Sequence, residues 1–126
     1  MSRTADSLGQ KYRQAAFVYL HVGLLYIFAV WVLNDAGLIP GERGPVWVWL
    51  AFGAAILGAV FWGLWSWQNA WFARVIWVLH ALRMPALVAG AFFPATESPI
   101  PSSFYLTALV VVLINLGMLA RAAWDL

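Results

Sequence analysis

The stretch "WFARVIWVLHALRMPALVAGAFF", residues Trp71 to Phe93, decides how this chain folds. As a helix rising about 1.5 Å per residue, it is long enough to cross a hydrocarbon core of about 30 Å. Its only charged side chains are Arg74, near the start, and Arg83, near the middle. A run this apolar and this long predicts a transmembrane helix.

Three other apolar runs of similar length lie on either side of it. The four predicted helices cover residues of about 12–33, 46–67, 71–93 and 104–124. Proline- and glycine-rich segments end the first and third runs, and the segment "SWQNAW" between the second and third allows only a tight turn. The predicted fold is therefore an all-α, four-helix transmembrane bundle that forms a single domain over residues 1–126.

The composition supports a lipid environment and excludes several classes of function. The chain is 64% hydrophobic and 10% charged, whereas soluble domains carry roughly 25% charged residues. Cysteine is absent, which excludes disulfides and thiolate metal sites. The basic residues are too scattered for a nucleic-acid surface. The N-terminal segment lacks the pattern of a cleaved signal peptide, so we expect the first helix to be retained.

Basic residues gather at one end of the predicted helices. The end that carries both termini holds Arg3, Lys11, Arg13, Arg74 and Arg121. The other end offers Arg43 alone, together with acidic residues. The positive-inside rule therefore places both termini in the cytoplasm, and we expect a prokaryotic cytoplasmic membrane.

Aromatic residues predict two interfacial belts at the helix ends. The expected outer belt is Trp31, Trp47 and Trp49, and the expected inner belt is Tyr12, Trp62, Trp65, Trp67, Trp71 and Trp124. Within the first helix, Tyr12, Tyr19 and Tyr26 recur every seven residues and share one face. We interpret this tyrosine stripe as a packing face.

The chain also matches itself weakly when its two halves are aligned. His21 falls on His80, Pro40 on Pro99 and Gly58 on Gly117. These matches fit either chance or a duplication that would produce two parallel helical hairpins.

Small residues recur at every fourth position of the second helix, at Ala51, Ala55, Ala59 and Gly63. This spacing lets another helix approach closely in a membrane. It predicts a helix-packing face, used either inside the bundle or between two copies of the chain.

Arg83 is the residue that most needs an explanation, because a charge near the middle of a membrane costs at least roughly 2.5–3.5 kcal/mol. His80 lies three residues before it on the same helical face. Pro85 cannot donate a hydrogen bond to the carbonyl of Ala81, and Asn115 is expected at a similar depth. We predict a polar clasp of Arg83, His80 and Asn115, in which Arg83 bonds this carbonyl, Asn115 and a tyrosine hydroxyl, with a lipid or cofactor as a further partner.

Two functional alternatives remain open for these polar residues. His21 and His80 are expected at matched depth, where two imidazoles could ligate a b-type haem in an electron-transfer anchor. Alternatively, Arg83 could receive an anion in a dimeric anion or small-solute transporter. Two histidines are too few for a non-haem metal site.

The sequence favours a third reading, a small accessory or structural membrane subunit. It contains no recognisable catalytic constellation, so we do not expect an enzyme. The expected partners are the lipid bilayer and either a larger membrane complex or a second copy of the chain. Contacts between helices would then carry the function.

Overall fold

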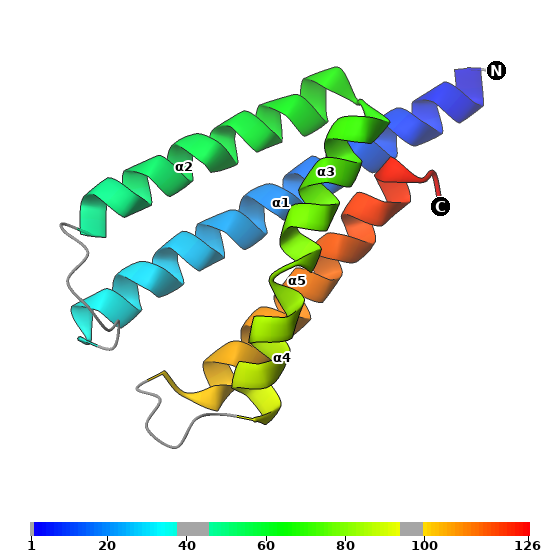
Figure 1. The fold of residues 1–126 in the computed structure, drawn as a ribbon. Helices are drawn as coiled ribbons and strands as arrows, with labels where there is room; N and C mark the ends of the chain where they lie inside the picture. Colours follow the sequence, from blue (N-terminus) through cyan, green and yellow to red (C-terminus); the bar gives the residue numbers. More distant parts are fainter. Residues whose placement is uncertain (1, 38–45, 94–99) are drawn as a thin grey trace.

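The computed structural model describes residues 2–37, 46–93 and 100–126, with side chains from residue 7 onward. Its elements are α1 (Ser2–Asp35), α2 (Val46–Trp62), the π-helical turn η1 (Gly63–Trp67), α3 (Ala70–Ala81), α4 (Met84–Phe92) and α5 (Ser102–Ala123) (Figure 1). All regular structure in these ranges is helical. Four segments are long and apolar enough to cross a membrane, namely Ser7–Asp35, Val46–Trp67, Ala70–Phe92 and Ser102–Ala123. The predicted all-helical integral membrane fold with four spans is confirmed.

The first helix is longer than predicted. It starts at Ser2 rather than near residue 12 and has 34 residues, which corresponds to about 51 Å of helix. The polar N-terminal segment therefore continues the helix beyond the apolar span. The loops 38–45 and 94–99, whose charges entered the orientation argument, lie outside the described residues.

A tight turn joins η1 to α3, as the sequence predicts. Gln68 takes a left-handed conformation with φ of 47°, and Asn69 caps the new helix. The Asn69 Oδ1 atom accepts hydrogen bonds from the backbone N–H groups of Trp71, at 2.8 Å, and Phe72, at 3.3 Å. The cap satisfies two donors at the start of α3, which otherwise have no intrahelical partner.

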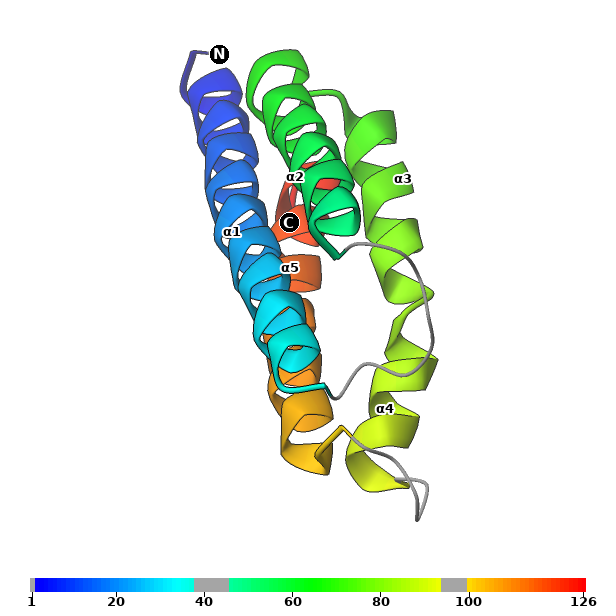
Figure 2. The same ribbon diagram turned by 90° about the vertical axis from the view of Figure 1, so that its left-hand side faces the viewer.

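The bundle is organised around α5. This helix packs against α1, α3 and α4, whereas α2 packs mainly on α1. Figures 1 and 2 show α1 and α2 running side by side, with α3 and α4 in line on the other side of the bundle. Both termini lie at the same end (Figure 1). The arrangement leaves α2 at the periphery.

Most of the core lies toward the end that carries the termini. Its fully buried residues include Tyr12 of α1, Leu64 of η1 and Leu119 of α5. The prediction that Tyr12 is an interfacial anchor is wrong, since only 1% of it is exposed. Tyr12 shares its face of α1 with Ala15, Ala16 and Tyr19, which are buried too. The tryptophans of the predicted belts are all exposed: Trp31, Trp47, Trp49, Trp62, Trp65, Trp67, Trp71 and Trp124.

Glycines let two pairs of helices approach closely. A Cβ atom at Gly23 of α1 would lie 2.4 Å from Leu57 Cδ1 of α2. A Cβ atom at Gly90 of α4 would lie 2.4 Å from the Tyr105 ring of α5. Close contact of this kind replaces the hydrophobic driving force that lipid does not provide.

We predict that Gly23→Ala destabilises the bundle by about 1–3 kcal/mol, because the new methyl group overpacks a filled site. Thermal unfolding in detergent measures the effect. The loss of stability caused by Gly23→Ala should be smaller in a Leu57→Ala background, because that substitution removes the clashing atoms. Gly53→Ala is the control, since nothing lies within 4 Å of its Cβ position. Equal melting temperatures for Gly23→Ala and the wild type would contradict this account.

Candidate functional site

The third span is broken near its middle. α3 ends at Ala81, and α4 begins at Met84 with Pro85 in its first turn. The backbone N–H of Arg83 donates to the His80 carbonyl at 3.1 Å, and that of Leu82 donates to the Val78 carbonyl at 3.0 Å. The prediction of a continuous helix over 71–93 is therefore wrong in detail. Proline lacks an N–H and its ring clashes with the carbonyl four residues earlier, which is the physical cause of the break.

His80, on the last turn of α3, reaches across to α1. Its Nε2 atom lies 2.9 Å from the Tyr19 hydroxyl oxygen, within hydrogen-bonding distance. The two rings meet edge to face, with centroids 5.2 Å apart. A polar contact of this kind inside an apolar bundle fixes the position of α3 relative to α1.

Arg83 also turns toward α1. Its guanidinium carbon lies 4.8 Å from the centre of the Tyr26 ring, in a cation–π arrangement. The side chain is partly buried, and within the described part of the chain it donates no hydrogen bond. The carboxylates whose side chains are described, Asp35 and Asp125, stand at the ends of the bundle. The charge is therefore stabilised by an aromatic ring rather than by an acid.

Asn115 does not join the predicted clasp. It is 1% exposed, and its Oδ1 atom has no hydrogen-bond partner among the described residues. The neighbouring Leu116 carbonyl accepts a hydrogen bond from Trp77 Nε1 at 3.1 Å. Trp77 precedes Arg83 by six residues, or about 9 Å of helix. Asn115 thus lies nearer the end that carries the termini than Arg83 does, and the two side chains share no hydrogen bond in the described part of the chain.

The structure does not bring His21 and His80 together. His21 is exposed, its Nδ1 atom lies 2.8 Å from the Phe17 carbonyl oxygen, and its ring contacts the Phe17 ring. Two residues apart on a helix means about 200° of rotation, so His21 points away from the side on which Tyr19 meets His80. The two imidazoles therefore do not fit as axial ligands of one haem.

The partners of His80 and Arg83 are two tyrosines that the sequence analysis assigned to packing. Tyr19 and Tyr26 both belong to the stripe that recurs every seven residues on α1. Their common face was visible in the sequence, and their hydroxyl and ring contacts were not. One signal in the sequence could have indicated these contacts. Tyr19 and Tyr26 of the first span lie at about the same depths as His80 and Arg83 of the third span.

The predicted small-residue face of the second span divides into two parts, three alanines on α2 and Gly63 on η1. Ala51, Ala55 and Ala59 are exposed, whereas Gly63 is buried. A Cβ atom at Gly63 would lie 2.6 Å from the Phe72 ring. The three alanines face away from α1, because α2 packs on α1 through Leu57 on its opposite face.

No protein-family model, no curated protein and no solved structure matches the chain.

We predict an energetic coupling between Tyr19 and His80 of about 0.6–1.7 kcal/mol, between the average and the largest value measured for hydrogen bonds between membrane helices. A double-mutant cycle with Tyr19→Phe and His80→Ala, followed by unfolding in detergent, measures it. Tyr26→Phe with His80→Ala is the matched control cycle, because Tyr26 contacts Arg83 instead. A Tyr19–His80 coupling no larger than that of the control would contradict the contact.

Proposed function

We propose that this chain is a small accessory or structural integral-membrane subunit that acts through contacts between helices. The observation that supports this proposal is the outward position of Ala51, Ala55 and Ala59 on α2. The partner is either a larger membrane complex or a second copy of the chain. No enzymatic activity is part of the proposal.

The chemistry of the α2 surface suits such a contact. In lipid, helices associate through close packing, and residues spaced four apart with small side chains allow the shortest approach. A Cβ atom at Gly58 would meet nothing within 4 Å, so this position adds open space beside the alanines. The tryptophan Trp47 and the phenylalanine Phe52 are exposed on the same helix and offer large apolar groups around the small ones.

The position of α2 in the bundle gives a second reason. Its main packing partner is α1, whereas α5 is covered by three other helices. One side of α2 is therefore available to another membrane helix. Leucine-rich lipid-facing surfaces need no small residues, so a ladder of alanines at helical spacing is better explained by a protein neighbour.

The proposal includes a location and an orientation. We place the subunit in a prokaryotic cytoplasmic membrane with both termini in the cytoplasm, on the basis of the positive-inside rule. Lys11, Arg13, Arg74 and Arg121 support this orientation, since all belong to the end that carries the termini. The hairpin of α1 and α2 and that of α3, α4 and α5 would be the two halves of a duplicated unit.

We predict that Ala55→Leu weakens the association by about 1–3 kcal/mol, or roughly 5- to 150-fold, because the larger side chain separates the helices. Two differently tagged copies are expressed together and purified in a mild detergent. Recovery of both tags shows self-association, and recovery of another protein in a fixed ratio shows a stoichiometric partner. Native gel mobility gives the size of the assembly.

Ala89→Leu is the matched control, since it makes the same change at an exposed position of α4. It should leave the association unchanged. Recovery of the wild type as a lone monomer would overturn the proposal. Equal recovery of a partner with Ala55→Leu and Ala89→Leu would exclude α2 as the contact face.

A second candidate function, the transport of small anions, is favoured by Arg83 alone. Its partly buried guanidinium lies in a broken span with an aromatic ring as its described neighbour. Chloride and inorganic phosphate efflux from proteoliposomes tests this candidate. We predict that Arg83→Gln lowers any protein-dependent efflux at least about tenfold, a loss of about 1.4 kcal/mol of anion stabilisation. Equal efflux from wild type and variant would exclude Arg83 as an anion site for transport.

A further inference from the structure

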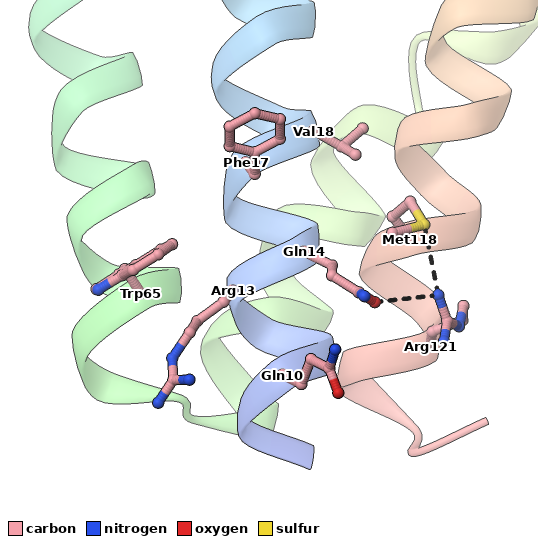
Figure 3. Close-up of a pocket in the computed structure, with 8 residues that line it drawn as sticks. All are labelled: Gln10, Arg13, Gln14, Phe17, Val18, Trp65, Met118 and Arg121. Atoms are coloured by element: carbon pink, nitrogen blue, oxygen red, sulfur yellow. Dashed lines mark hydrogen bonds between the residues drawn. The ribbon is translucent and has the colours of Figure 1, made fainter. Parts of the chain in front are cut away.

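A shallow depression lies at the end of the bundle that carries the termini, between α1, η1 and α5 (Figure 3). Its volume is about 450 Å³. Arg13 and Arg121 stand on either side of α1, while Phe17 lies farther along the helix (Figure 3). The depression is thus basic at one end and apolar at the other.

Neither arginine of this depression meets a carboxylate among the described side chains. The Nη1 atom of Arg121 lies 3.4 Å from the Gln14 side-chain oxygen and 3.8 Å from the Met118 sulfur, and both partners are neutral. Arg13 is exposed and has no ion pair in the described part of the chain. Both guanidinium groups therefore keep donors available for an anion.

Among the described side chains, the other basic residues at this end are already engaged. Lys11 forms a salt bridge of 2.8 Å with Asp125. Arg74 donates to the Ala123 carbonyl at 3.2 Å and lies over the rings of Trp71 and Trp124. The available positive charge is consequently concentrated at Arg13 and Arg121 rather than spread over the whole end.

The depression also crosses the boundary between polar and apolar surface. Along α1, the change from Arg13 and Gln14 to Phe17 takes about one helical turn. Phe17 is 58% exposed and Trp65 is 42% exposed. Exposed aromatic rings next to arginines are typical of the level where lipid headgroups meet acyl chains.

We infer that this depression binds an acidic phospholipid. Arg121 donates hydrogen bonds to the phosphate group, Arg13 adds electrostatic attraction from the other side of α1, and the acyl chains lie along Phe17, Trp65 and Met118. Guanidinium groups suit this role because their planar donors match phosphate oxygens. A free inorganic anion would leave the apolar half of the depression unused. This inference does not depend on the contact face of α2.

Native mass spectrometry of the full chain, in detergent with equal amounts of phosphatidylglycerol and phosphatidylcholine, tests the inference. We predict that phosphatidylglycerol adducts dominate for the wild type. Arg13→Gln and Arg121→Gln should each lower their abundance about fivefold, the effect expected of one basic residue near a lipid surface. Arg13→Lys and Arg121→Lys keep the charge and should retain most of the binding.

Lys11→Gln is the matched control, because it removes one positive charge at the same end but outside the depression. Because Lys11 is already paired with Asp125, this variant should lower the adducts clearly less than either arginine variant. An equal loss with Lys11→Gln would show nonspecific attraction and overturn the site. Equal wild-type binding of the two lipids would overturn it as well. Displacement of phosphatidylglycerol by millimolar inorganic phosphate would assign the arginines to a free anion and refute the lipid.

Discussion

Backbone hydrogen bonding in an apolar solvent governs this molecule. Inside a bilayer each N–H and C=O group must find its partner within the protein, and continuous helices meet that requirement. Within the interior of the described spans, Pro85 is the residue that has no backbone N–H and so cannot donate a backbone hydrogen bond. The chain responds by ending α3, inserting a turn at Leu82 and Arg83 and starting α4. The same break positions Arg83 and leaves His80 on the last turn before it, so the polar residues of the third span are located by the backbone defect.

The bundle uses small residues in two different ways. Gly23 and Gly90 lie inside, where Leu57 and Tyr105 occupy the space that a Cβ atom would need. These contacts join α1 to α2 and α4 to α5, and α5 then connects the two parts. Ala51, Ala55 and Ala59 lie outside, where no described residue covers them. The inner set packs helices together within the bundle, and the outer set is the face that we propose as the contact with a partner.

The candidate site could be predicted in part. The sequence indicated that His80 and Arg83 share a helical face near mid-membrane, because helical periodicity and the length of the run fix both depth and face. It did not indicate that their partners are Tyr19 and Tyr26, which come from α1. The sequence placed Asn115 at the depth of Arg83, yet on α5 it lies nearer the end of the bundle that carries the termini. Periodicity orients a side chain around its own helix and carries no information on which helix stands opposite.

By itself, the sequence determined that this protein is an integral membrane helical fold with four spans, and it located their ends to within a few residues in three of the four. Hydropathy and span length suffice for this because the bilayer imposes a fixed thickness on every segment. Only the tertiary structure decided that α5 is central, that Tyr12 is buried, that His21 and His80 point to different sides and that the α2 alanines face outward. These features depend on how each helix is rotated against its neighbours. Such rotations arise from close packing of individual side chains, and in a chain that is apolar on almost every face the hydrophobic pattern does not specify them.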